Sequence, residues 1–236
     1  MKKLLKYLAK LCCAFLLLYV IVRLMGYDLF GLNLPINLPN LPSITSPTTP
    51  IETPDDIKEL VKSIRVSTEN QTEKYNRDAW EKPNKKFNLN GESLSRVKYA
   101  VYTSKWLVSR EPFEYLCPYT GKTITDITVL DYEHLIALNY IHKYGNINWD
   151  DDKKNEFAYD LRIGVPVLNS ANRSKSDKGP SEWLPNYRNE DFCYSWLWIA
   201  STYDIALRQV DIDVCIREIE KGLANGETLE LLMQYD

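Results

Sequence analysis

Three short segments between residues 131 and 185 bring together side chains that can hold a metal ion and move a proton. They read D-Y-E-H-L-I at 131–136, V-P-V-L-N-S-A-N-R-S-K-S-D at 165–177 and E-W-L-P at 182–185. Carboxylate and amide oxygens bind hard divalent ions, and a neighbouring imidazole can deprotonate water. The chain contains 2 histidines, so His134 has a single rival as general base. These residue types predict metal-assisted cleavage of phosphodiester bonds.

Local patterns place these segments on strand, insert, strand and helix, in that order. The stretch 122–130 is rich in Thr, Ile and Val and predicts a strand. A charged helix is expected from Asp150 to about Asp160, and 163–168 predicts a second strand. Asn169 or Ser170 would cap the following helix, which carries the Asn and Lys of the second segment. The chemical residues are therefore expected on neighbouring elements.

This arrangement resembles the HNH (ββα-metal) endonucleases. The likeness is closest to the bacterial type marked by D-x-[DE]-H-x-x-P and N-R-S-K-x-D, which has many exported members. The matching stretches here are D-Y-E-H at 131–134, D-L at 160–161, N-R-S-K-S-D at 172–177 and P-S-E-W-L-P at 180–185. Y-N-R-D at 75–78 is similar to a further Y-x-R-D element. The resemblance spans about residues 70–205.

The resemblance implies a role for each site residue. His134 is expected to be the general base that takes a proton from the attacking water. Glu133 and Asn172 are expected to hold one divalent ion, Mg²⁺ before Mn²⁺ or another metal. Asp131 would share a strand face with Glu133, because side chains alternate along a strand, and would ligate directly or through water. No organic cofactor is expected.

Lys175 and Arg173 are the candidates for contacting a nucleic-acid phosphate. With Arg162 and Lys178 they outweigh Asp177 and give residues 162–178 a local charge of +3. Residues 55–236 as a whole carry 24 basic and 30 acidic side chains, a net charge of −6. That balance argues against tight non-specific binding to nucleic acid and leaves a local basic patch open. The expected partner is DNA, with RNA as the alternative.

Two positions depart from the family pattern. Ala137 stands where a proline usually follows the histidine, and Ile163 stands where the middle Asn of the HNH triplet is expected. Because Ile163 has no polar side chain, His134 is expected to be oriented by a backbone carbonyl or another substitute. Ile163 keeps a second hypothesis open, a degenerate HNH module that binds nucleic acid or a protein partner without cutting. A cell-envelope structural protein is a third.

The chain is predicted to have three parts. Residues 1–30 contain four lysines, an apolar run at 11–22 and then Arg23, which predicts a signal anchor or a cleaved signal peptide. Either would place the rest outside the cytoplasm, anchored to the membrane or secreted. Residues 31–54 hold six of the 12 prolines and predict a semi-rigid linker. Residues 55–236 are the expected endonuclease domain.

The predicted fold class is α+β, a mainly helical domain around a ββα-metal core. Asp55 or Asp56 is expected to cap its first helix. Cys117, Cys193 and Cys215 allow one disulfide and one free thiol outside the cytoplasm, with the pairing undetermined. The sequence leaves open the strand preference, the cleavage of the signal segment, the physiological metal, any inhibiting protein partner and the biological role.

Overall fold

The structure, a computed structural model, describes residues 51–68, 73–81, 85–145 and 147–233. All of these residues belong to one compact unit, Thr45–Asp236. The predicted membrane segment at 1–30 and the linker up to residue 50 lie outside the described residues. Within the described ranges, every helix is too short or too polar to cross a membrane.

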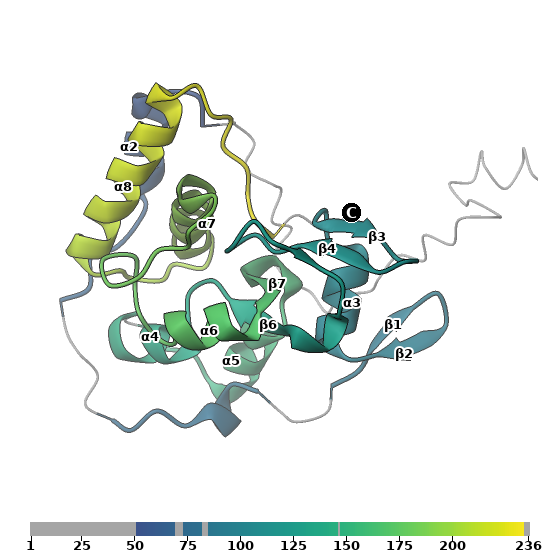
Figure 1. Ribbon diagram of the computed structural model, residues 1–236. Coiled ribbons are helices and arrows are strands. Elements are labelled where there is room, and N and C mark those ends of the chain that lie inside the picture. The colour runs from purple at the N-terminus through teal and green to yellow at the C-terminus, as the bar shows by residue number, and fades with distance from the viewer. Residues whose placement is uncertain (1–50, 69–72, 82–84, 146, 234–236) are drawn as a thin grey trace, which may run out of the picture. The chain divides into compact units, whose positions relative to one another are not determined.

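The described unit is a mixture of helices and short strands, which confirms the α+β prediction (Figure 1). In chain order the elements are α2 (Pro54–Lys62), η1 (Arg77–Ala79), β1 (Phe87–Leu89), β2 (Glu92–Leu94), α3 (Arg96–Thr103), β3 (Leu107–Ser109), β4 (Glu114–Leu116), β5 (Thr123–Ile124), η2 (Ile127–Val129), β6 (Leu130–His134), α4 (Leu138–Tyr144), α5 (Asp151–Ala158), η3 (Leu161–Ile163), β7 (Gly164–Leu168), α6 (Asn169–Lys175), α7 (Asn189–Thr202) and α8 (Gln209–Ala224). The η elements are single 3₁₀ turns.

Strands β6 and β7 form an antiparallel pair, and α6 follows β7 without a loop (Figure 1). In their register Asp131 lies opposite Val167, Glu133 opposite Val165 and His134 opposite Gly164. Helices α4 and α5 occupy the insert between the strands. The predicted order of strand, insert, strand and helix is therefore confirmed.

The predicted bounds of the first strand are wrong. Residues 122–130 form only the short β5 and the turn η2, and the longer strand begins at Leu130. The Asp126 side chain accepts a hydrogen bond from the backbone N–H of Thr128, 2.9 Å away, and so caps η2 instead of allowing an extended chain. As a result the acid-acid-His segment lies on the strand itself and not after it.

Two predicted helix caps are also wrong. Helix α6 begins directly after Leu168, the last paired residue of β7, so neither Asn169 nor Ser170 is outside the helix to cap it. Helix α2 is capped by Thr53, whose hydroxyl and backbone N–H exchange hydrogen bonds with Asp56 in a capping box. Both helices form where the sequence predicts them, but the residues at their N-caps differ from the predicted ones.

The core under the strand pair is built from α7 and α8. Every residue of α7 from Asp191 to Ala200 is buried. The indole Nε1 of Trp196 donates to the backbone oxygen of Leu135, 2.6 Å away, directly after the end of β6. The Tyr140 hydroxyl of α4 donates to Asp211 of α8 across 2.6 Å. These bonds fix the insert and the end of β6 to the same core.

The three cysteines that the structure describes are free thiols in the interior. Cys193 on α7 and Cys215 on α8 lie beside one another, and burial together with the Cys193 thiol raises the pKa of Cys215. Cys117 lies elsewhere, with its sulfur 3.5 Å from the backbone nitrogen of Leu168. The structure thus brings together one of the pairs that the sequence left undetermined.

Gly164 is required by the close approach of β7 to β6. A Cβ atom here would lie 2.3 Å from the backbone oxygen of Glu133 and 2.7 Å from the Tyr132 ring. We expect Gly164→Ala to lower the free energy of unfolding by about 1–3 kcal/mol through overpacking. Urea unfolding followed by circular dichroism measures this, with Ser170→Ala on the exposed face of α6 as the neutral control. An unchanged midpoint in Gly164→Ala would contradict the close approach.

Candidate functional site

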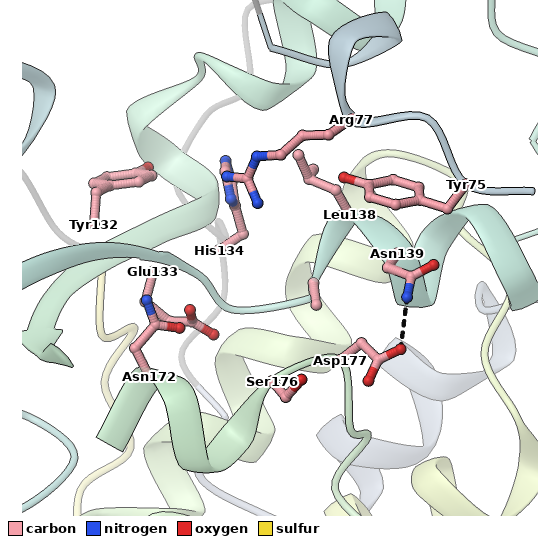
Figure 2. Close-up of a pocket in the computed structure, with 11 residues that line it drawn as sticks. Tyr75, Arg77, Tyr132, Glu133, His134, Leu138, Asn139, Asn172, Ser176 and Asp177 are labelled. Atoms are coloured by element: carbon pink, nitrogen blue, oxygen red, sulfur yellow. Dashed lines mark hydrogen bonds between the residues drawn. The ribbon is translucent and has the colours of Figure 1, made fainter. Parts of the chain in front are cut away.

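A polar cavity of about 320 Å³ opens where β6, α4 and α6 meet η1 (Figure 2). Glu133, His134 and Asn172 of the predicted site residues line it. Asp131, Lys175 and Arg173 are not among its lining residues. The remaining lining residues are Tyr75, Arg77, Tyr132, Ala137, Leu138, Asn139, Ser176 and Asp177.

His134, the last residue of β6, is held by a backbone carbonyl. Its Nε2 lies 2.8 Å from the oxygen of Ala158 at the end of α5. A carbonyl only accepts hydrogen bonds, so Nε2 carries the proton and a neutral ring keeps its free lone pair on Nδ1. This confirms the expectation that a carbonyl orients His134. Ile163 is buried in the core, and its backbone oxygen accepts from Leu135 at 3.0 Å.

The same carbonyl also accepts from Arg96. The Arg96 guanidinium lies 2.7 Å from the Ala158 oxygen and 3.4 Å from His134 Nε2, so two donors share one acceptor. Arg96 also forms an ion pair with Glu81. Burial, and next the Arg96 charge, lower the pKa of His134 to about 4. At neutral pH the imidazole is therefore uncharged, which is the form that accepts a proton.

Glu133 is buried and pairs with a buried lysine beneath the cavity. Lys175 is 0% exposed, and its Nζ lies 2.6 Å from Glu133 Oε1 and 3.3 Å from the backbone oxygen of His134. The prediction that Lys175 contacts a phosphate at the surface is corrected, because its ammonium points inward from α6 onto β6. Burial raises the pKa of Glu133, and Lys175 opposes that shift.

Asn172 turns its amide toward the cavity from α6 (Figure 2). Its Nδ2 lies 3.4 Å from Asp131 Oδ2, and a carboxylate can only accept, so the amide oxygen is left for another partner. Asp131 thus contacts Asn172 but is not one of the residues that line the cavity. The geometry favours an orienting role for Asp131 over the direct ligation that was one expectation.

The predicted basic strip at 162–178 does not form a continuous patch. Arg162 is engaged by Asp160, 2.5 Å away, and Lys175 is buried. Lys178 donates to the backbone oxygen of Ser174 across 2.9 Å. Arg173 remains on the exposed face of α6, where it donates to Asn169 at 3.2 Å. Its expected phosphate contact stays a prediction.

Arg77 and Asp177 are the charged residues lining the cavity that were not among the predicted site residues, and Arg77 is the positive one. It is the cationic side chain that lines the cavity within the described ranges, and it is 65% exposed. Figure 2 shows its guanidinium directed toward His134. Its other contact is an ion pair with Glu81, which also binds Arg96. The Y-x-R-D element at 75–78 was the sequence signal for this residue.

Asp177, the last residue of the N-R-S-K-S-D segment, fixes this loop to α4. Its Oδ2 accepts from Asn139 at 2.6 Å (Figure 2). The same oxygen accepts from Lys143 at 2.7 Å. The Lys143 hydrogen bond is the main cause that lowers the pKa of Asp177. The preceding Ser176 has φ 54°, an uncommon conformation for a residue other than glycine. This anchor holds the C-terminal end of α6 at the cavity.

The donor atoms at the cavity are oxygens that suit a hard divalent ion. Glu133 Oε1 is buried and has no hydrogen-bond partner of acceptable geometry in the described part of the chain, although Lys175 lies close. The Asn172 amide oxygen is the second available donor. No group of three or more His, Cys, Asp or Glu side chains suited to a metal occurs within the described ranges. Any ion here would therefore have few protein ligands and would complete its shell with water or substrate oxygens.

Comparisons with known proteins leave the family of the chain undefined. No protein-family model matches it, and no solved structure matches it. The chain is 31% identical over 98 residues to a protein of Arthroderma benhamiae described as an uncharacterized secreted protein. The match covers 40% of this chain and 48% of that protein, so the chain spans about half the length of the relative.

The buried pair of Lys175 and Glu133 makes a stability prediction. We expect Lys175→Met to lower the free energy of unfolding by about 3–5 kcal/mol, because the Glu133 charge is left buried without a partner. The double variant with Glu133→Gln should regain much of that loss. Urea unfolding of the four proteins in a double-mutant cycle gives the coupling. If the loss of unfolding free energy in the double variant equals the sum of the losses in the two single variants, the two side chains do not interact directly.

Proposed function

We propose that the chain is a metal-dependent endonuclease of the HNH type that hydrolyses phosphodiester bonds of DNA, with RNA as the alternative substrate. The observation that carries the proposal is the state of His134. Its Nε2 is fixed as a donor to Ala158, and its pKa of about 4 keeps it neutral. A neutral imidazole with Nδ1 free, at a cavity lined by oxygen donors, is suited to accept a proton from water.

Glu133 and the Asn172 oxygen are the residues proposed to hold one divalent ion, with Mg²⁺ expected first. When bound, such an ion supplies positive charge that stabilises the charge developing on the phosphate and on the leaving oxygen. Lys175 restricts Glu133 by occupying the neighbourhood of Oε1. Asp131 fixes the Asn172 amide so that its oxygen and not its nitrogen is available.

Arg77 is proposed to bind the scissile phosphate, in the role that Lys175 was expected to share. Its side chain is exposed at the cavity even though it pairs with Glu81, whereas Lys175 is buried and Lys143 is not among the lining residues. A guanidinium can donate two parallel hydrogen bonds to phosphate oxygens. In the proposed reaction His134 takes the proton of a water molecule, the water oxygen attacks phosphorus and the bond to the leaving oxygen breaks.

We also propose that the domain works outside the cytoplasm, either anchored through residues 1–30 or secreted. The basic and apolar N-terminal sequence supports this. The relative described as secreted gives it further, weaker support, because the match covers less than half of either protein. Anchorage in the membrane rests on the sequence pattern alone.

A non-cutting module that binds nucleic acid or a protein is the second candidate. The ion pair of Glu133 with Lys175 favours it, because Lys175 already balances the carboxylate charge without any metal. Ile163 favours it as well, since its side chain offers no hydrogen bond near His134. The two candidates share the cavity and differ in whether cleavage occurs.

The base assignment is tested by nicking of supercoiled plasmid by the full-length chain, purified in mild detergent, with Mg²⁺ or Mn²⁺. We expect His134→Ala to lower the nicking rate by about 10²–10⁴-fold, because the proton acceptor is lost. His142→Ala is the matched control, since His142 is the other histidine and its Nε2 bonds the backbone oxygen of Glu73 instead. EDTA should stop the reaction.

Two results would contradict the proposed hydrolysis. A folded wild-type protein that nicks with none of the divalent ions would favour the binding module. Nicking that survives in His134→Ala at the wild-type rate would remove His134 as the base.

The phosphate-binding role of Arg77 is tested by the same nicking assay. We expect Arg77→Ala to lower kcat/KM by about 10–100-fold through the loss of a charge-assisted contact with the phosphate. Arg217→Ala is a closely matched control, because Arg217 is 64% exposed and pairs with a glutamate in the same way on α8. Equal kinetics for the two variants would show that Arg77 has no specific role.

A further inference from the structure

A row of alternating cationic and aromatic side chains leads away from the cavity. It begins at Tyr132, which lines the cavity and whose ring centroid lies 5.4 Å from that of His134. The Arg96 guanidinium lies 4.4 Å from the centre of the Tyr132 ring and 5.1 Å from that of Tyr159. Lys85 Nζ lies 4.5 Å from the Tyr159 ring and 5.9 Å from the Phe87 ring. We call these five residues, Tyr132, Arg96, Tyr159, Lys85 and Phe87, the cation–aromatic row.

The row ends at the hairpin of β1 and β2, because Phe87 is the first residue of β1. Figure 1 places this hairpin beside α3, the helix that carries Arg96 and that contacts both β1 and β6. The row therefore joins the cavity strand β6 to a hairpin through one helix. Its outer members, Lys85, Phe87 and Tyr159, are exposed or partly exposed, while Tyr132 is buried.

The two cations of the row have different roles. Arg96 is fixed by Ala158 and Glu81, so it belongs to the support of His134. Lys85 is exposed, and in the part of the chain that the structure describes it forms no ion pair. Its ammonium rests on aromatic rings, where attraction to the ring faces holds it without neutralising its charge. Lys85 is thus the member available to an anion.

The charges around Lys85 are of both signs. Arg96, which pairs with Glu81, is the cation that acts on Lys85, and Glu156 and Asp160 are the acidic groups that act on it. Burial, and next the Arg96 charge, lower the pKa of Lys85, against opposing effects of Glu156 and Asp160. An anion that contacts Lys85 would also be attracted by the charge of Arg96, which acts at the position of Lys85.

We infer that the cation–aromatic row binds an unpaired stretch of a nucleic-acid strand and guides it into the cavity. The inference rests on the proposed function, since it names the form of the substrate. Cations that contact phosphates, interleaved with aromatic rings that contact bases, are the usual surface for single strands. Bases in a duplex are stacked on each other and offer no face to a protein ring.

The test measures binding without cleavage, in the full-length chain carrying His134→Ala, with EDTA present. Fluorescence anisotropy compares a fluorescein-labelled single-stranded 20-mer DNA, the RNA of the same sequence and the DNA duplex. We expect single strands to bind more tightly than the duplex. Lys85→Ala should weaken single-strand binding by about tenfold and lower the slope of log K against log salt by about 0.7, as loss of one phosphate contact predicts.

Two controls make the result specific to the row. Lys153→Ala removes an exposed lysine that lies 5.1 Å from a different ring, Trp149, and should bind like the parent protein. Tyr159→Phe keeps the ring and should bind normally, while Tyr159→Leu should lose about tenfold. Because Lys85 is at the surface, its variant tests the row even if Tyr159→Leu fails to fold.

Failure of the row and failure of the proposed function are separable. Unchanged affinity and salt slope in Lys85→Ala, or duplex binding as tight as single-strand binding, would overturn the row whatever the nicking assay shows. If single-strand binding depends on Lys85 but the wild-type chain never cleaves, the row's role in binding stands and the proposed hydrolysis is refuted.

Discussion

The contact between Lys175 and Glu133 is the constraint around which the site is arranged. A fully buried ammonium and a buried carboxylate 2.6 Å apart are each costly alone and tolerable together. Because Lys175 is on α6 and Glu133 is on β6, the pair sets how the helix lies on the strand. The position of the Asn172 amide, one turn earlier on α6, depends on that same contact. A lysine that resembles a surface residue in the sequence is thus a structural centre.

A second contact, between the Ala158 carbonyl and two donors, sets the protonation of the histidine at the site. The carbonyl of Ala158, at the end of α5, receives both His134 and Arg96. The insert between β6 and β7 therefore supplies the group that sets the tautomer of the histidine. Arg96 adds positive charge beside a buried ring, which disfavours the imidazolium and keeps the ring ready to accept a proton. Glu81 then connects Arg96 to Arg77 at the cavity.

This arrangement separates supporting charges from available ones. Lys175, Lys143 and Arg162 are each engaged by a carboxylate and serve the fold. Arg77, although it pairs with Glu81, and Lys85 remain exposed, one at the cavity and one in the outer part of the cation–aromatic row. An acidic domain can in this way direct a few positive groups toward one strand of an anionic polymer without a broad basic face. The proposed substrate form follows from the placement of those groups and not from net charge.

The sequence by itself determined the α+β class and the order of strand, insert, strand and helix, and its resemblance to the HNH endonucleases pointed to Glu133, His134 and Asn172. The class and the order follow from local propensity and from the alternation of side chains along a strand, which are short-range effects. The tertiary structure alone decided that Lys175 is buried, that Ala158 holds His134 and that Arg77 reaches the cavity. Each of these depends on contacts between residues 24 to about 60 positions apart, which no local pattern encodes. Burial decides whether a charge is a ligand, a support or a surface group, and burial is a property of packing.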